Sequence, residues 1–389
     1  MIRPSLLLRP ARPPAIGRAA LLTAGLVGLA GTPSPAHAQG GGNGVIYMAA
    51  YDHSIKVIDE NSLEIVDEFE TSIGIPIGLT LSADHERIYV RDAEFEEIEI
   101  FDVATRRSLD SFTLSRGSSR VRIWGMEVDP AEEFVILNTM RYTKRIDRWE
   151  IDEAVLLKYD LQDKRVTDTI PWPEGEGGRR ARMMFSPEGE YLYFFSRGNI
   201  LVLETEGFTE VDRWDLSRPL EEGLGRFSFG FPTSPHDDEG FHTGLFNFTD
   251  PVQNRRMMGI ARVNLAERDV DFFTLGPSQG VSFRLAPGGR KAYGLVQQIG
   301  NYEFWTFDLE GRRVENRQRF AGRPRMSLEI SSNGELLYVY NAGSTIDVYD
   351  ADSYEFIRTV TFDADMTSFV MIPEGTGPRA DSGGSPGQP

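Results

Sequence analysis

The chain lacks cysteine entirely: none occurs among its 389 residues. This absence excludes disulfides, haem attachment through Cys-x-x-Cys-His, thiolate metal sites and a lipidated N-terminal cysteine. Histidine is scarce too, with 5 in the chain, and no Gly-x-Ser-x-Gly, His-Glu-x-x-His or phosphate-binding Gly-Lys-Ser/Thr motif occurs. The sequence therefore predicts no cofactor, no metal ion and no catalytic residues of its own.

Positive charge is also in short supply. Lysine and arginine together number 41 against 59 acidic residues, which gives a formal net charge of −18 at pH 7. A chain this acidic repels nucleic acid and anionic lipid, so neither is an expected partner. Beyond residue 38 there is no 3.6-residue apolar period of useful length, so strands are the expected regular structure.

The N-terminus has the pattern of an export signal. Four arginines precede an apolar run over 19–30, and Ala36-His37-Ala38 follows it. The run is too short to span a bilayer, and small residues at 36 and 38 suit a signal peptidase. We expect residues 1–38 to be a secretory signal peptide cleaved after Ala38, which predicts a periplasmic or secreted protein. Loss of its 4 arginines leaves 37 basic residues against 59 acidic ones, a net charge of −22.

The rest of the sequence repeats one cadence seven times. In its clearest copy the segment 182–185 leads into the turn Ser186-Pro187-Glu188-Gly189, and further strands follow. The copies recur at a spacing of roughly 40–57 residues, the range of four-stranded propeller blades. The segments ahead of the seven turns are 78–81, 125–128, 182–185, 230–233, 282–285, 327–330 and 368–371.

Two kinds of residue alternate within these segments. The second position is apolar in all seven copies, and the first is small in six, with Arg182 the exception. A period of two is typical of a β-strand with one packed face. We interpret the segments as innermost strands, whose small residues suit the crowding where blades converge on a central channel. The other predicted strands include 45–50, 53–59, 63–70, 87–92, 97–105, 107–114, 335–341, 344–350 and 354–362.

The two ends of the repeat region complement each other. Residues 43–71 read as three strands without an inner one, and 366–373 read as an inner strand alone. Pairing them completes a seventh blade and buries both sheet edges. The sequence thus predicts an all-β, seven-bladed propeller of four-stranded antiparallel blades over residues 43–375. The Gly/Pro/Ser-rich stretch 376–389 is an expected disordered tail.

Three short stretches resemble a known family. The Ser-Pro-Glu-Gly turn, Leu337-Tyr338-Val339-Tyr340 and the Ile-x-Val-Tyr-Asp of 346–350 are similar to the exported YVTN-type seven-bladed propellers. The resemblance covers most of residues 43–375. It implies the fold and says little about function.

A narrower resemblance is to the β subunit of quinohemoprotein amine dehydrogenase, a periplasmic seven-bladed propeller. It rests on 124–130 and the long excursion 141–152, on an elongated blade around 244–250, and on the ending 348–352. In that family the propeller holds partner subunits that carry haems and a tryptophan-derived quinone, and it has no redox centre of its own. The resemblance therefore implies a non-catalytic scaffold subunit with protein partners.

Binding residues in a propeller usually lie in loops on one rim of the ring. Assigning the loops blade by blade places many arginines on one rim, and the excursion adds Lys144, Arg145, Arg148 and Trp149. Such a mouth would bind an acidic partner subunit or a small anion through bidentate guanidinium contacts. No aromatic cage is expected to accompany the charges. The rim arginines are Arg116, Arg120, Arg122, Arg179, Arg180, Arg226, Arg323 and Arg325. The binding candidates at the channel mouth are Arg120, Arg122, Trp124, Glu127, Arg180, Arg182, Arg284, Arg325 and Glu329.

The same residues allow other interpretations. The arginines could neutralise acids on the neighbouring hairpin 94–99, or plug the channel, where Glu127 and Glu329 could pair with Arg182 and Arg284. Channel carboxylates alone could perform acid/base chemistry, as in lactone-hydrolysing propellers, if their pKa were raised. A stand-alone protein that binds small anions is a third interpretation.

Histidine and carboxylates crowd together once, over 234–242. This cluster has the residue types of a metal site. Its Ser-Pro-x-Asp start, however, aligns with the turn of the other blades. We therefore interpret these residues, like His53 and His85, as turn residues.

Overall fold

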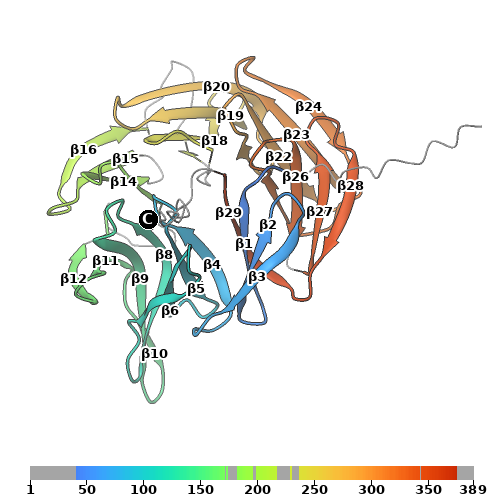
Figure 1. The fold of residues 1–389 in the computed structure, drawn as a ribbon. Coiled ribbons are helices and arrows are strands. Elements are labelled where there is room, and N and C mark those ends of the chain that lie inside the picture. Colours follow the sequence, from blue (N-terminus) through green and yellow to red (C-terminus); the bar gives the residue numbers. More distant parts are fainter. Residues whose placement is uncertain are drawn as a thin grey trace, which may run out of the picture. The chain divides into compact units, whose positions relative to one another are not determined.

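The computed structural model describes residues 41–170, 172–173, 182–195, 199–216, 228–229, 236–341 and 343–374. Every regular element in these residues is a β-strand, and the strands form seven antiparallel sheets. Figure 1 shows the sheets arranged as blades around a ring. The predicted fold class, an all-β seven-bladed propeller, is confirmed.

The blades follow one another along the chain. Within each blade the strands are given from the innermost to the outermost. Blades 1 and 2 consist of β29 (Met366–Ile372), β1 (Val45–Ala50), β2 (Ser54–Asp59) and β3 (Glu64–Glu70), and of β4 (Pro76–Leu81), β5 (Arg87–Asp92), β6 (Glu97–Asp102) and β7 (Ser108–Thr113). Blade 3 has five strands: β8 (Ser119–Val128), β9 (Phe134–Lys144), β10 (Trp149–Ile151), β11 (Val155–Asp160) and β12 (Arg165–Ile170). Blades 4 and 5 consist of β13 (Met183–Phe185), β14 (Tyr191–Phe195), β15 (Asn199–Glu204) and β16 (Glu210–Asp215), and of β17 (Ser228–Phe229), β18 (Phe241–Asp250), β19 (Arg255–Asn264) and β20 (Asp269–Pro277). Blades 6 and 7 consist of β21 (Arg284–Leu285), β22 (Lys291–Gln298), β23 (Asn301–Asp308) and β24 (Arg313–Arg319), and of β25 (Met326–Ile330), β26 (Leu336–Asn341), β27 (Thr345–Asp350) and β28 (Phe356–Thr361).

The ring closes where the chain ends meet. β29 pairs antiparallel with β1, with Val370 opposite Tyr47, so the last strand becomes the inner strand of blade 1. The described residues form seven buried apolar clusters, and each cluster joins two neighbouring blades, including blades 7 and 1. Each blade is therefore packed on both faces, and the predicted closure is confirmed.

A buried glutamate ties blade 1 to blade 7. Glu60 is fully buried in the turn after β2. Its carboxylate accepts hydrogen bonds from the backbone N–H groups of Gly44 at 2.9 Å and Ser332 at 2.7 Å, and from the Tyr338 hydroxyl at 3.3 Å. A side chain at Gly44 would bring its Cβ to 2.6 Å from Glu60 Oε2, which explains the glycine.

The turn between the third and fourth strands has one design in five blades, whereas blades 4 and 5 keep its positive φ but end the third strand on Glu204 and Asn264. The strand-ending aspartate accepts the N–H of the residue three positions on, as Asp350 does from Ser353 at 2.7 Å and Asp102 from Thr105 at 2.6 Å. The next residue has a positive φ, and the strand pairing then shifts register. This geometry explains the aspartate that ends Ile-x-Val-Tyr-Asp. The residues with positive φ are Leu63, Arg106, Lys164, Phe208, Arg268, Arg312 and Tyr354.

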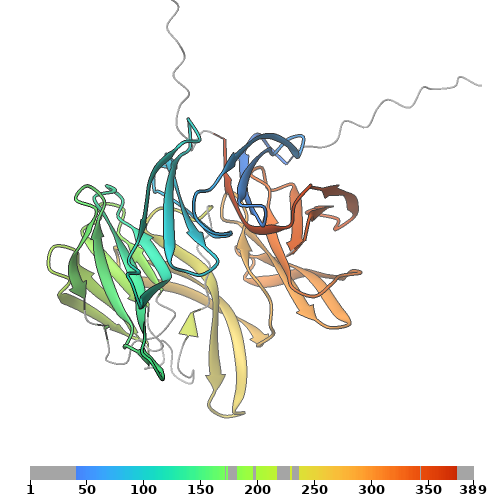
Figure 2. The same cartoon turned by 90° about the horizontal axis from the view of Figure 1, so that it is seen from below.

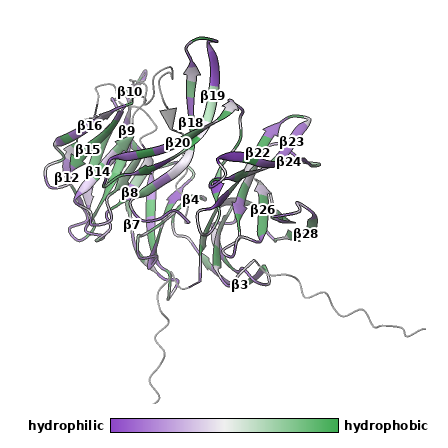
Figure 3. Ribbon diagram, turned by 90° about the horizontal axis from the view of Figure 1, so that it is seen from above, coloured by the Kyte–Doolittle hydropathy of each residue, from purple (hydrophilic) through white to green (hydrophobic). Residues whose placement is uncertain are grey.

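The alternation of the inner strands is clearest in β25, whose residues are alternately buried and half-buried, and Figure 3 shows hydrophobic and hydrophilic residues along the same strands. Phe283 and Leu328 are buried between blades, whereas Ser327 is half-buried. The expectation that small residues at the first position reflect crowding is wrong at Gly125, where a Cβ would meet no atom closer than 4.0 Å. At Gly78 the space is taken by the Arg91 side chain, 3.4 Å from such a Cβ.

Two blades carry hairpins longer than the others. β18 and β19 have ten residues each, in agreement with the elongated blade expected around 244–250, and this yellow hairpin projects in Figure 2. The predicted excursion 141–152 is mostly regular structure, because β9 runs on to Lys144 and β10 pairs back onto it. The hairpin of β9 and β10 extends outward at the bottom of Figure 1.

Some predictions concern residues outside the described ranges. They are the signal peptide 1–38, the tail 376–389, the inner-strand segment 230–233, and the three arginines Arg179, Arg180 and Arg226. In the described part of the chain no helix is long and apolar enough to cross a bilayer.

Candidate functional site

Two glutamates occupy the same position of the repeat in different blades. Glu127 lies on β8 of blade 3 and Glu329 on β25 of blade 7. Both are the third residue of an inner-strand segment, and both are half-buried. Their surroundings differ, so the same position gives two chemically different carboxyl groups.

Glu329 has the arginine partner that the sequence suggested. Arg284 of blade 6 donates from Nε to Glu329 Oε2 at 3.0 Å. Burial raises the pKa of Glu329, and the charge of Arg284 opposes that rise. Burial and the negative charge of Glu329 together raise the pKa of the neighbouring Tyr340. We therefore interpret Arg284 and Glu329 as a structural ion pair.

Glu127 has no such partner. Among the residues that the structure describes, none donates a hydrogen bond to Glu127 or forms an ion pair with it. The suggested pairing of Glu127 with an arginine is therefore not found among these residues. Burial alone raises the pKa of Glu127 to about 8. At pH 7 the carboxyl group is therefore mostly protonated and can donate a hydrogen bond or a proton.

Arg120, Arg122 and Trp124 belong to strand β8 and not to a rim loop, because β8 begins at Ser119. Arg120 Nη1 lies 3.2 Å from Glu96 Oε2. This pair fits the interpretation in which rim arginines neutralise the acidic hairpin.

Aromatic rings accompany some of these cations in blades 2 and 3. The Arg122 guanidinium lies over the Tyr142 ring, 5.3 Å from its centre. Trp124 packs on Phe95 with ring centres 4.8 Å apart. The Arg91 guanidinium lies over the same Phe95 ring, 4.9 Å from its centre. Cation–π contacts of this kind hold the guanidinium groups in place.

Arg91 is a site residue that the repeat pattern does not reveal. It donates from Nη1 to the backbone oxygen of Ile123 at 3.1 Å, and burial lowers its pKa. Only the strand register places it in the site, because Arg91 lies opposite Gly78. The small residue at 78 is the one signal in the sequence that could have found it.

The predicted rim arginines fall into two groups. Arg116, Arg120 and Arg122 enter blade 3, whereas Arg323 and Arg325 enter blade 7. These blades are not neighbours in the ring, since blades 1 and 2 lie between them. The described rim arginines therefore enter two blades that are separated along the ring, and the cationic mouth stays a prediction. Arg182, the remaining described candidate, precedes β13 in blade 4.

The cations of the β9–β10 hairpin are largely neutralised within it. Arg145 Nε donates to Glu150 at 2.8 Å, and Arg148 Nη2 donates to the other oxygen of the same carboxylate at 3.0 Å. Exposed ion pairs of this kind are worth little energetically. They leave the hairpin with little net positive charge to offer a partner.

The hairpin instead exposes apolar side chains. Ile146 at its tip is fully exposed, and Trp149 and Ile151 on β10 are 52% and 60% exposed. Large apolar groups that gather on a projecting element mark an interaction surface more often than isolated ones do. We call Ile146, Trp149 and Ile151 the hairpin tip.

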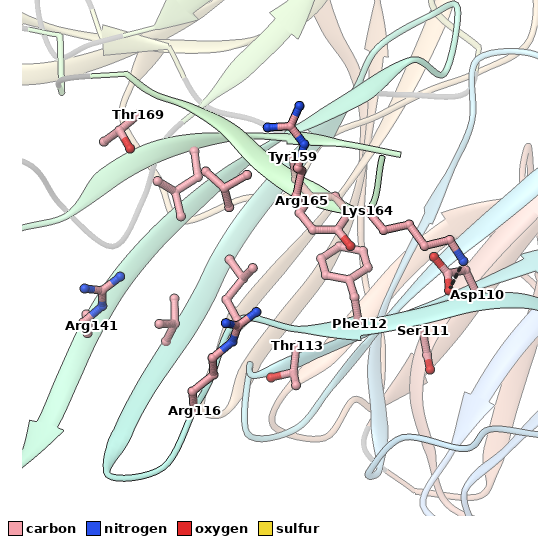
Figure 4. Close-up of a pocket in the computed structure, with 14 residues that line it drawn as sticks. Asp110, Ser111, Phe112, Thr113, Arg116, Arg141, Tyr159, Lys164, Arg165 and Thr169 are labelled. Atoms are coloured by element: carbon pink, nitrogen blue, oxygen red, sulfur yellow. Dashed lines mark hydrogen bonds and ion pairs between the residues drawn. The ribbon is translucent and has the colours of Figure 1, made fainter. Parts of the chain in front are cut away.

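A groove of about 580 Å³ lies between the outer strands of blades 2 and 3 (Figure 4). Its floor is apolar, with Phe112 stacked on Tyr159 at 4.0 Å between ring centres. Four cations and one acid line it, and that acid, Asp110, is held by Lys164 at 2.9 Å. The lining residues are Asp110, Ser111, Phe112, Thr113, Leu114, Arg116, Val121, Arg141, Leu157, Tyr159, Lys164, Arg165, Val166 and Thr169.

The described histidines of the 234–242 stretch are core and turn residues. His242 is buried on β18 and packs edge-on against Phe195 of blade 4, at 5.7 Å between ring centres. Burial lowers the pKa of His236. Within the described ranges no three histidine or carboxylate side chains are arranged to hold a metal ion.

Comparison with known proteins supports the fold and no particular family. No protein-family model matches the chain, and no curated protein matches it. A solved structure of a functionally unknown protein from Desulfotomaculum acetoxidans is similar, with 13% identity over 85% of this chain and 99% of that one and a TM-score of 0.52. Apo AztD from Citrobacter koseri matches with 14% identity over 85% of this chain and 98% of that one, with a TM-score of 0.50. The dihydro-heme d1 dehydrogenase NirN reaches 15% identity over 88% of this chain and 78% of that one, at a TM-score of 0.49.

Proposed function

We propose that the protein is an exported, non-catalytic propeller that serves as a binding or scaffold subunit of a periplasmic complex. The observation that carries this proposal is the hairpin tip, where one hairpin exposes Ile146, Trp149 and Ile151. An isoleucine kept wholly in water contributes nothing to the stability of the fold. Tryptophan is also the residue type that most often anchors protein interfaces.

The partner class follows from the resemblance seen in the sequence. An amine-dehydrogenase-like propeller would hold subunits that carry haem and a quinone. The absence of cysteine supports a purely structural part in such a complex, because this chain cannot attach haem through Cys-x-x-Cys-His.

Affinity capture from the source organism tests this proposal. The tagged full-length chain, expressed in the periplasm, should recover a defined partner that gives a haem absorbance spectrum. The double variant Ile146→Ser/Trp149→Ala should lose that partner. The matched variant Ile299→Ser, which changes another nearly fully exposed isoleucine in the β22–β23 turn, should keep it.

The outcomes separate the levels of the proposal. Recovery of only the monomer under every growth condition would contradict a scaffold role. A partner retained by the hairpin variant would contradict the role of the hairpin tip. A partner without haem would contradict the amine-dehydrogenase-like version alone.

A second candidate function rests on Glu127. A carboxyl group that is protonated at neutral pH and lacks a counter-ion can act as a general acid in a hydrolase or isomerase of the lactone-cleaving kind. Assays on a panel of lactones would detect such activity. Glu127→Gln should abolish it, whereas Ile146→Ser should leave it unchanged. Activity that survives Glu127→Gln would exclude this glutamate as the catalytic acid.

A further inference from the structure

The groove between blades 2 and 3 is lined by strand edges. Five consecutive residues, 110–114, contribute to its wall, and all but the last belong to β7. Side chains of consecutive strand residues point to opposite faces, so a run without gaps means that the groove follows the edge of the strand.

That edge is the unpaired edge of its sheet. β7 is the outermost strand of blade 2, and the facing β12, which supplies Arg165, Val166 and Thr169 to the groove, is the outermost strand of blade 3. An outermost strand leaves a row of backbone N–H and C=O groups for another chain. The groove therefore offers main-chain partners as well as side chains.

The charges of the groove select for acidic groups. Among the described residues neither Arg116 nor Arg141 has a side-chain partner, and both side chains are exposed. The two come from one end of the groove: Arg116 closes a turn with Ser119 through backbone hydrogen bonds of 2.9 Å, and Val121, two residues on, pairs with Arg141. In Figure 4, Arg116 and Arg141 both lie to the left of Thr113.

The floor of the groove supplies an apolar surface. Val121, Leu157 and the stacked rings of Phe112 and Tyr159 line the groove between the two strands. A ligand that fits must therefore be long, must place apolar groups on this floor, and must carry negative charge toward the end at Arg116. An extended peptide with alternating apolar and acidic side chains has all three properties.

We propose that this groove binds an extended acidic segment of another protein, which adds as a strand along β7 and places carboxylates on Arg116 and Arg141. The chain's own segment 375–389 is a poor candidate, because it contains one arginine and one aspartate and so carries no excess of acid. The inference adds a second contact to the proposed scaffold role. It does not depend on the hairpin tip.

A peptide-binding experiment tests the proposal without a natural partner. The probe is a fluorescein-labelled, end-capped peptide of eight residues that alternates glutamate and valine, titrated by fluorescence anisotropy with the full-length protein. We expect binding that weakens with added salt. Arg116→Ala/Arg141→Ala should weaken it by about tenfold or more. The matched control is Arg255→Ala/Arg256→Ala, which removes the same charge from exposed positions of β19.

Backbone methylation of the probe tests strand addition separately. Two further peptides are N-methylated at every odd or every even residue, because only one of these two sets can donate hydrogen bonds to β7. We expect one methylated peptide to lose binding by about tenfold or more and the other to keep it.

Several results would overturn the inference. They are no rise in anisotropy up to roughly 1 mM protein, equal loss in the β19 control, equal binding of a lysine–valine peptide, and equal binding of both methylated probes. Full displacement of the labelled probe by citrate, at the same concentration as unlabelled peptide, would likewise overturn the inference. It would indicate a small-anion site. None of these results would alter the capture experiment on the hairpin tip, so the two proposals fail independently.

Discussion

Blades 1 and 3 are both antiparallel sheets of the ring, but their polar side chains have different surroundings. In blade 1, Glu60 is fully buried and accepts hydrogen bonds from three residues. Lys56 is equally buried, and its ammonium group lies 3.0–3.2 Å from the carboxylates of Asp52, Glu68 and Asp363. In blade 3, Glu127 has no partner among the described residues.

The difference separates structural charges from available ones. Buried charge is tolerated in a fold when it is paired or hydrogen-bonded. In blade 1, Lys56 has ion pairs and Glu60 accepts hydrogen bonds. Blade 3 and the turn that leads into it instead contain the unpaired carboxyl group of Glu127, the unpaired guanidinium groups of Arg116 and Arg141, and the exposed hairpin tip. None of these charged groups has a side-chain partner among the described residues, so we propose that blade 3 carries the function.

The largest expected effect is the loss of the Glu60 contacts. Glu60→Ala should leave several buried donors without an acceptor and reduce the free energy of unfolding by about 3–5 kcal/mol. Glu64→Ala, an exposed neighbour on β3, should change it by less than about 0.5 kcal/mol. Urea unfolding at pH 7 measures both. Equal effects from the two variants would show that Glu60 does not hold the closure.

The second effect depends on pH and belongs to Glu127. Its pKa in the fold, about 8, lies above the ordinary value of 4.5, so the folded state binds the proton more tightly than the unfolded state does. Stability should then fall as pH rises from about 4.5 through about 8. Glu127→Gln should match the wild type at pH 4.5 and exceed it at pH 8.5 by roughly 2–4 kcal/mol. Parallel stability curves for the two proteins would rule out a raised pKa.

A third change should turn the paired glutamate into an unpaired one. Arg284→Met removes the partner of Glu329, so the pKa of Glu329 should rise further and the protein should lose roughly 1–3 kcal/mol at pH 8. The double variant Arg284→Met/Glu329→Gln should recover most of that loss. If the double variant is no more stable than the single one, the 3.0 Å contact contributes little.

The smallest expected effect is at the hairpin tip. Ile146→Ser/Trp149→Ala should change the free energy of unfolding by less than about 1 kcal/mol, because Ile146 is fully exposed and Trp149 is 52% exposed. Thermal unfolding with circular dichroism detection checks this. A larger loss would mean that the tip packs within the fold and is not free for a partner.

The sequence predicted the blades because their signals are local. The predicted strands 45–50 and 87–92 coincide with β1 and β5, since alternation and the flanking turns mark both ends. What it could not predict depends on register and on the angle between blades. Arg91 enters the site only through its pairing with Gly78, and the groove joins Thr113 to Thr169, which are far apart in the sequence. The pairing of Glu329 and the isolation of Glu127 likewise follow from neighbouring blades.

Hydrogen exchange of the captured complex, compared with the free chain, tests most directly whether blade 3 is the docking side. The account predicts slower exchange over 141–152 and over 110–116 in the complex, with no change in the β22–β23 turn of blade 6. Protection confined to other blades, with unchanged exchange over both segments of blades 2 and 3, would contradict it.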